Sequence, residues 1–85
     1  MKYQMYISLA GENKIAAFSI NDLGKPTLQF KKNIPGKPAP LVIDKNKKFL
    51  YVGCRDSLQI TTLLRNEKSG ELEILSSTSL PSDPC

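Results

Sequence analysis

The chain has 85 residues, 40% of them hydrophobic, and a formal net charge of +4. This length allows one small domain or a piece of a larger one, and no segment approaches the roughly 20 apolar residues of a membrane span. Basic residues are mixed with acidic ones and do not interleave with aromatic ones, so the charge predicts solvated loops and no nucleic-acid partner.

Alternating apolar and polar residues predict three β-strands in the first part of the chain. The expected strands are residues 3–9, 14–20 and 27–34. The segments 10–13 and 21–26 between them are rich in Asn, Asp and Gly, which are typical of turns.

Prolines at 35, 38 and 40 follow the third strand. Since proline has no N–H to donate to a ladder, we expect residues 35–40 to form an ordered crossing between two sheets. The later expected strands are residues 41–44, 49–54, 58–65 and 71–80. No segment has convincing helical periodicity, so the sequence predicts an all-β antiparallel meander.

The two halves of the chain repeat each other. Tyr6 matches Tyr51 (51 − 6 = 45), and Ile15 matches Ile60 at the same offset. Further matches, now at an offset of 46, are Gly24 with Gly70, Pro35 with Pro81 and Pro38 with Pro84. Units of about 45 residues with four strands are typical of β-propeller blades. An all-β sandwich or a small barrel is the alternative.

The repeat therefore predicts a partial β-propeller of about two four-stranded antiparallel blades. Residues 1–34 would form a first blade that lacks its inner strand, and 35–80 a second blade, with 81–85 starting the crossing to a third. Propellers have about four to eight blades. We therefore expect an N-terminal piece of a longer protein or the product of a truncated gene, and open blade edges would permit self-association.

Two cysteines, Cys54 and Cys85, lack metal-ligand spacing, and the chain contains no histidine. Two cysteines are too few for the disulfide framework of a small secreted domain. We therefore expect free thiols, no metal site and a cytoplasmic location.

The repeated residues resemble the N-terminal blades of the bacterial propeller-type 6-phosphogluconolactonases. The similar segments are 6–8, 34–36, 50–55, 70–72 and 80–84. The resemblance implies a seven-bladed ring without a cofactor that hydrolyses 6-phosphogluconolactone to 6-phosphogluconate in the pentose phosphate pathway. It also implies that the catalytic residues lie beyond residue 85, so that this segment alone would be inactive.

Arg55 is the candidate substrate-binding residue. It follows a strand, is expected on the same face as the proline crossings, and carries a guanidinium group that can bind a phosphate bidentately. An ordinary surface arginine paired with Asp56 is the alternative, and Lys37 on the same face is expected to be solvated. The catalytic base stays unassigned, and Tyr6 and Tyr51 are expected to pack in the core.

Two other functions stay open. The chain could belong to a non-catalytic propeller that binds a protein or a sugar, or it could be a non-functional truncated gene product. Acidic and histidine residues on the loops of later blades would favour the enzyme, whereas uncharged aromatic loops would favour the binding module.

Overall fold

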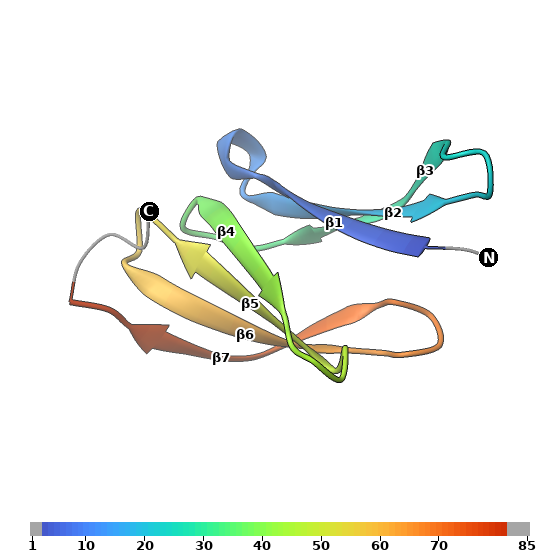
Figure 1. The fold of residues 1–85 in the computed structure, drawn as a ribbon. Helices are drawn as coiled ribbons and strands as arrows, with labels where there is room; N and C mark the ends of the chain where they lie inside the picture. Colours follow the sequence, from blue (N-terminus) through green and yellow to red (C-terminus); the bar gives the residue numbers. More distant parts are fainter. Residues whose placement is uncertain (1–2, 82–85) are drawn as a thin grey trace.

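The computed structural model describes residues 3–81, which form two antiparallel β-sheets. The first sheet contains β1 (Tyr3–Leu9), β2 (Lys14–Ile20) and β3 (Pro26–Asn33). The second contains β4 (Pro38–Ile43), β5 (Phe49–Cys54), β6 (Gln59–Arg65) and β7 (Leu72–Ser79). Strands pair in sequence order, and the first sheet lies over the second (Figure 1). The predicted all-β meander is confirmed.

One apolar layer lies between the two sheets. Ile15 and Ile34 of the first sheet region are fully buried against Leu50, Val52 and Leu63 of the second. Alternation along each strand places every second side chain in this layer and the next on the opposite face of its sheet. The second sheet therefore has a covered face, with Leu50 and Val52, and an outer face.

The turns after β2 and β6 confirm the internal repeat in atomic detail. The Asn21 Oδ1 atom accepts hydrogen bonds from the backbone N–H groups two and four residues later (2.9 and 3.0 Å). Asn66 Oδ1 likewise accepts hydrogen bonds from the backbone N–H groups of the residues two and three positions after it (2.9 and 3.0 Å). Gly24 and Gly70 close these turns with φ of 80° and 79°. The second turn is one residue longer, which accounts for the change of offset from 45 to 46.

A β-bulge occurs at the same place in both sheets. The register of β2 with β3 shifts between Ala17 and Phe18, and that of β6 with β7 shifts between Thr62 and Leu63. In each case one residue of the outer strand, Gln29 or Leu75, is passed over in the pairing. A bulge bends and twists a strand locally, so the two sheets share a deformation as well as a topology.

Three predicted features are wrong. The crossing ends before Pro38, because β4 begins there; β4 is an edge strand, where proline is tolerated, and its register with β5 is broken between Pro38 and Leu41. Leu58 lies in the turn before β6 with φ of 52°. Tyr51 is on the outer face of the second sheet and is 38% exposed, whereas Tyr6 packs against the core.

A single turn of 3-10 helix, Ala10–Glu12, replaces the simple turn that was expected after β1. Except for Pro81, the predicted start of a third crossing lies outside the described residues, as does Cys85. The division into two blades at residues 34 and 80 stays a prediction.

The turns after β1 and β5 both contain a left-handed residue. Asn13 has φ of 54° and Leu58 has φ of 52°, again 45 residues apart. Their carbonyl oxygens accept equivalent hydrogen bonds, from Ile34 N (2.8 Å) and Leu80 N (2.7 Å). Asparagine tolerates this conformation, but for leucine it costs about 1–2 kcal/mol.

We expect Leu58→Asn to stabilise the chain by about 1 kcal/mol, because asparagine adopts the left-handed conformation more readily. The mirror variant Asn13→Leu should destabilise it by about 1–2 kcal/mol, since it also removes the hydrogen bond that Asn13 Oδ1 accepts from Lys37 N (3.0 Å). Urea denaturation measures both. If both variants changed the free energy of unfolding in the same direction, the structural repeat of these turns would be contradicted.

The turn after β4 is held by the Asp44 carboxylate. It accepts hydrogen bonds from the Phe49 and Lys48 N–H groups (both 2.7 Å) and from the Asn46 N–H group (3.2 Å). These bonds, that of Phe49 foremost, lower the pKa of Asp44 below its ordinary value. A group with a lowered folded-state pKa stabilises the fold above the unfolded pKa of about 4 and loses that contribution as pH falls through the folded pKa.

We therefore expect the free energy of unfolding to fall as the pH drops below about 4. Asp44→Asn should flatten this dependence, because asparagine does not titrate. Denaturation midpoints of the two proteins at several pH values test the prediction. If the denaturation midpoints of the two proteins fell equally with pH, the acid sensitivity would come from other carboxylates.

Candidate functional site

The predicted site residue Arg55 lies in the turn between β5 and β6. Its backbone N–H donates to Lys37 O (3.1 Å), and the N–H of Asp56 donates to Gly36 O (3.0 Å). Two backbone hydrogen bonds thus fix this turn beside the segment that joins the two sheets. The expected placement of Arg55 next to that crossing is confirmed.

The charges around this turn are exposed. Lys37 Nζ lies 3.6 Å from Asp56 Oδ2, and the two side chains are 55% and 61% exposed. Asp56 therefore has Lys37 as an ionic partner. An exposed pair of this kind contributes little to stability. Lys37, Arg55 and Asp56 thus form an exposed charged surface where the crossing meets the turn.

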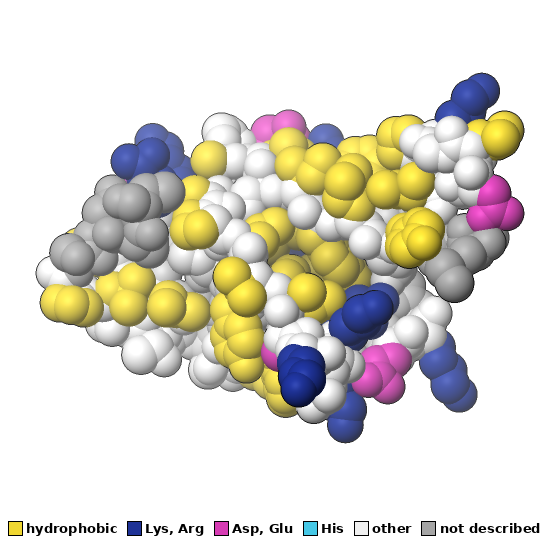
Figure 2. Space-filling view, in the orientation of Figure 1, with side chains coloured by type: hydrophobic (Ala, Val, Ile, Leu, Met, Phe, Trp, Pro, Cys, Tyr) yellow, Lys and Arg dark blue, Asp and Glu magenta, His cyan; other side chains and the backbone are white. Residues whose placement is uncertain are grey.

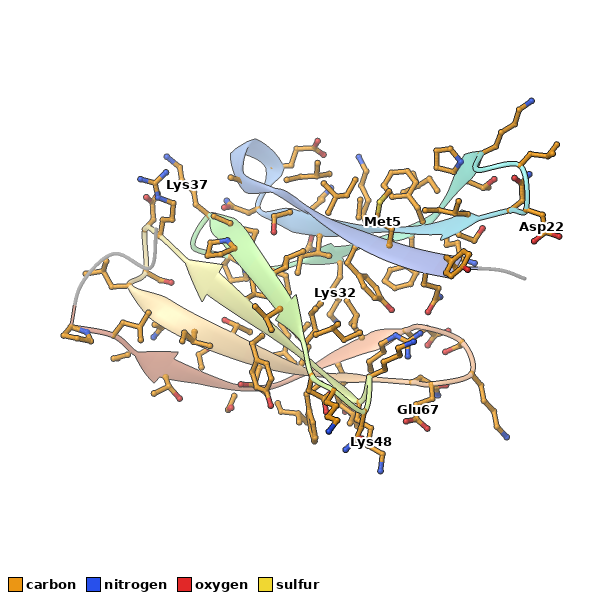
Figure 3. All side chains as sticks on the ribbon, in the orientation of Figure 1. Met5, Asp22, Lys32, Lys37, Lys48 and Glu67 are labelled. Atoms are coloured by element: carbon orange, nitrogen blue, oxygen red, sulfur yellow. The ribbon has the colours of Figure 1, made fainter. Side chains whose placement is uncertain are left out.

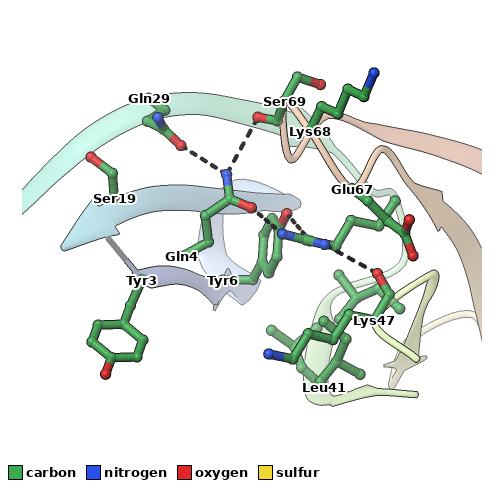
Figure 4. Close-up of a pocket in the computed structure, with 13 residues that line it drawn as sticks. Tyr3, Gln4, Tyr6, Ser19, Gln29, Leu41, Lys47, Glu67, Lys68 and Ser69 are labelled. Atoms are coloured by element: carbon green, nitrogen blue, oxygen red, sulfur yellow. Dashed lines mark hydrogen bonds between the residues drawn. The ribbon is translucent and has the colours of Figure 1, made fainter. Parts of the chain in front are cut away.

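A second candidate site lies at the other end of the sheets. Figure 3 shows Lys37 at one end of the molecule and Lys48 and Glu67 at the other. At that end, between the two sheets, is a cavity of about 700 Å³ (Figure 4). Its lining includes Tyr3, Gln4, Tyr6, Gln29, Lys47 and Arg65. None of these residues was predicted to form a site.

The Arg65 guanidinium group bridges the sheets beside this cavity. Nε donates to the Tyr6 hydroxyl oxygen (3.0 Å) and Nη1 to Lys47 O (3.1 Å), while Nη2 donates to Gln4 Oε1 (Figure 4). The Tyr6 hydroxyl group in turn donates to Gly70 O (2.6 Å). These residues come from β1, β6 and the turns after β4 and β6.

Gln4 extends the network on the other side. Its Nε2 atom donates to Gln29 Oε1 (3.2 Å) and to Ser69 O (3.3 Å). Glycine suits position 70, because its φ of 79° strains other residues and a Cβ atom there would displace the end of the Gln4 side chain.

All three nitrogens of Arg65 donate to neutral acceptors of the protein itself. This arrangement makes Arg65 a clamp between the sheets. Arg55, on the exposed turn at the other end, stays the predicted anion-binding residue. The sequence does carry a signal for the clamp. Gln4 and Arg65 depart from the repeat, because Phe49 and Ile20 stand at the corresponding positions.

Among residues 3–81, no group of three or more His, Cys, Asp and Glu side chains lies close enough together to hold a metal ion. In the same part of the chain, no helix has the length and apolar character needed to cross a membrane. The thiol of Cys54 is buried and contacts the Thr61 hydroxyl group at 3.5 Å.

The family model described as lactonase, 7-bladed beta-propeller, matches residues 2–85. The chain belongs to this family. Its two sheets are therefore propeller blades: blade 1 is β1–β3 and blade 2 is β4–β7. The predicted partial β-propeller and the resemblance to propeller lactonases are both confirmed.

Two solved structures share the fold. A putative 6-phosphogluconolactonase from Bacteroides fragilis superposes with a TM-score of 0.82 at 22% identity over 94% of this chain. The periplasmic gluconolactonase of Pseudomonas aeruginosa superposes with a TM-score of 0.79 at 20% identity over 86%. The chain spans 23% and 21% of the length of these two proteins.

Arg65 and Arg55 should contribute differently to the free energy of unfolding. We expect Arg65→Ala to lower the free energy of unfolding by about 2–3 kcal/mol, because it removes charge-assisted hydrogen bonds between the blades. Arg55→Ala is the matched control and should change it by less than about 0.5 kcal/mol. Urea denaturation tests both, and a loss of similar size in the two variants would contradict the clamp.

Proposed function

We propose that this chain supplies two blades of a propeller that hydrolyses a sugar lactone. The observation that carries the proposal is the match of the lactonase family model to residues 2–85. The names of the two structural relatives, a gluconolactonase and a putative 6-phosphogluconolactonase, point to the same class of reaction.

The finer proposal is that the substrate is 6-phosphogluconolactone, opened to 6-phosphogluconate in the pentose phosphate pathway. In this reaction water adds to the lactone carbonyl, the ring C–O bond breaks, a carboxylate and a hydroxyl group form, and one proton is released. The proposal also keeps the cytoplasm as the compartment, because a phosphorylated sugar does not cross a membrane unaided.

Arg55 is the residue that we propose to hold the phosphate group. Its turn is anchored to the crossing by the hydrogen bonds to Lys37 O and Gly36 O. Phosphate is a dianion that binds well to a guanidinium group on a rigid support. Lys37, whose Nζ atom lies 3.6 Å from Asp56 Oδ2, adds positive charge beside the same turn.

Residues 1–85 alone are proposed to be inactive. The reaction needs a base for the water and donors for the oxyanion. The chain covers less than a quarter of the length of its structural relatives. We therefore assign the base and the oxyanion donors to other blades of a complete ring.

The test uses the protein encoded by the complete gene and two substrates, 6-phosphogluconolactone and unphosphorylated gluconolactone. Arg55→Ala should raise KM for the phosphorylated lactone about tenfold or more and leave KM for the other substrate nearly unchanged, because one charge-assisted contact is lost. Lys45→Ala, in the turn at the opposite end of the blade, is the matched control.

If Arg55→Ala changed KM equally for both substrates, Arg55 would not bind the phosphate group, and the lactonase proposal would still stand. Absence of turnover of either lactone by the complete protein would refute the enzyme and favour the binding module.

A further inference from the structure

The segment 34–37, which joins the two blades, is hydrogen-bonded to two different turns. Ile34 N donates to Asn13 O in the turn after β1 (2.8 Å), and Arg55 N in the turn after β5 donates to Lys37 O (3.1 Å). Figure 2 shows Lys and Arg side chains at the surface of this end of the molecule, where Figure 3 places Lys37. The segment therefore connects a turn of blade 1 to the turn that carries Arg55.

The side chain of Asn13 makes a further bond to this segment. Its Oδ1 atom accepts a hydrogen bond from Lys37 N (3.0 Å). Lys37 has a φ of 57°, a left-handed conformation that is unfavourable for residues with a Cβ atom. The bond from Asn13 stabilises Lys37 in this conformation, and Lys37 O is the acceptor for Arg55 N. Two hydrogen bonds in series thus connect the Asn13 side chain to the backbone of Arg55.

Gly36 brings the segment into direct contact with the Arg55 turn. Its φ is 97°, and its carbonyl oxygen accepts a hydrogen bond from Asp56 N (3.0 Å). A Cβ atom at position 36 would lie 2.9 Å from Ser57 Cβ and 3.3 Å from Cys54 Cβ. Because close-packed groups transmit displacements to one another, a shift of the segment also shifts the turn.

The internal repeat separates the Asn13 side-chain bond from the general construction of a blade. The backbone bond that Asn13 O accepts recurs at the next turn, where Leu80 N donates to Leu58 O (2.7 Å). The side-chain bond does not recur, because the leucine at position 58 has no side-chain acceptor. The backbone bond is therefore the shared feature of the two turns, and the bond from Asn13 Oδ1 is an addition in the first.

Two other residues of this region also depart from the repeat. Arg55 corresponds to Ala10 (55 − 10 = 45), and Gly36 corresponds to Ser82 (82 − 36 = 46). Asn13, Gly36 and Arg55 are far apart in the sequence, yet hydrogen bonds of the segment join them. Since the other copy of the repeat has none of the three, a shared role at the Arg55 surface accounts for them.

We infer that Asn13 is a positioning residue that holds Arg55 for phosphate binding. The inference rests on the proposed role of Arg55 as the phosphate-binding residue. Asn13 Oδ1 holds Lys37, and the carbonyl groups of Gly36 and Lys37 hold the backbone of Arg55 and its neighbour. A guanidinium group on a backbone that is already ordered loses less conformational freedom when it binds an anion.

The first test removes only the side-chain acceptor. Asn13→Gly keeps the turn, because glycine adopts a positive φ readily. In the protein encoded by the complete gene, it should raise KM for 6-phosphogluconolactone about threefold to tenfold and leave KM for gluconolactone nearly unchanged. Asn21→Ala is the matched control. It removes two side-chain hydrogen bonds from the turn at the other end of β2 and should change neither KM.

A double variant shows whether Asn13 acts through Arg55. Once Arg55→Ala has removed the guanidinium group, adding Asn13→Gly should change KM for the phosphorylated lactone by less than about twofold. A merely structural role of Asn13 would raise this KM by the same factor with and without Arg55.

Amide hydrogen exchange of the same protein gives a readout that does not depend on turnover. Asn13→Gly should speed the exchange of the Arg55 and Asp56 amides about threefold or more, because both donate to the segment that Asn13 holds. Asn13→Asp keeps an oxygen acceptor and should keep the wild-type exchange rates, as should Asn21→Ala.

Two results would overturn the inference and leave the proposed function in place. One is a selective rise in KM for the phosphorylated lactone in Arg55→Ala with no rise in Asn13→Gly. The other is unchanged exchange of the Arg55 and Asp56 amides in Asn13→Gly. If Arg55→Ala itself had no selective effect, the proposed phosphate site would fail, and the inference with it.

Discussion

The structure depends on one constraint: each of its sheets is apolar on both faces, and only one face of each is covered within the chain. Ile15 and Ile34 meet Leu50, Val52 and Leu63 in a single layer, and this layer is the core. A two-sheet unit of this kind buries a modest area, since a chain of about 85 residues leaves much of its surface in water. Its outer faces are therefore surfaces that can still be covered.

The contact between the blades is apolar in the middle and polar at one end. Arg65 donates to a hydroxyl group, an amide and a backbone carbonyl, and so it joins three separate parts of the chain with directional bonds. The apolar layer provides most of the attraction between the sheets, while the bonds of Arg65 define how the sheets are aligned. The cavity of about 700 Å³ lies beside Arg65, at the polar end of this contact.

The two ends of the blades differ in a way that bears on function. At one end, backbone hydrogen bonds hold the Arg55 turn against the crossing and leave charged side chains at the surface. At the other, Arg65 is engaged with the protein itself. The first end is exposed, whereas the second is bound into the contact between the blades. The proposed phosphate-binding role of Arg55 rests on the exposure of its turn and on the backbone hydrogen bonds that support it.

Strand order, turn positions and the two-blade repeat could be predicted from the sequence because they rest on local chemistry. Alternation places β1 through β7 within a few residues, and Asn21, Gly24, Asn66 and Gly70 form turns for reasons contained in each residue. The repeat then indicated the propeller before any contact was known. The position of Arg55 beside the crossing could also be predicted, because successive loops of an antiparallel meander lie at opposite ends of the sheet.

The exposure of Tyr51, the start of β4 at Pro38 and the Arg65 clamp were decided only by the tertiary structure. Tyr6 and Tyr51 occupy equivalent strand positions, yet one is covered and the other is not, because burial depends on whether another sheet lies against that face. Proline is tolerated in β4 because that strand is an edge. Gln4 and Arg65, 61 residues apart, meet only when two sheets stack. Local chemistry determined the elements, and long-range packing decided which of their faces are covered.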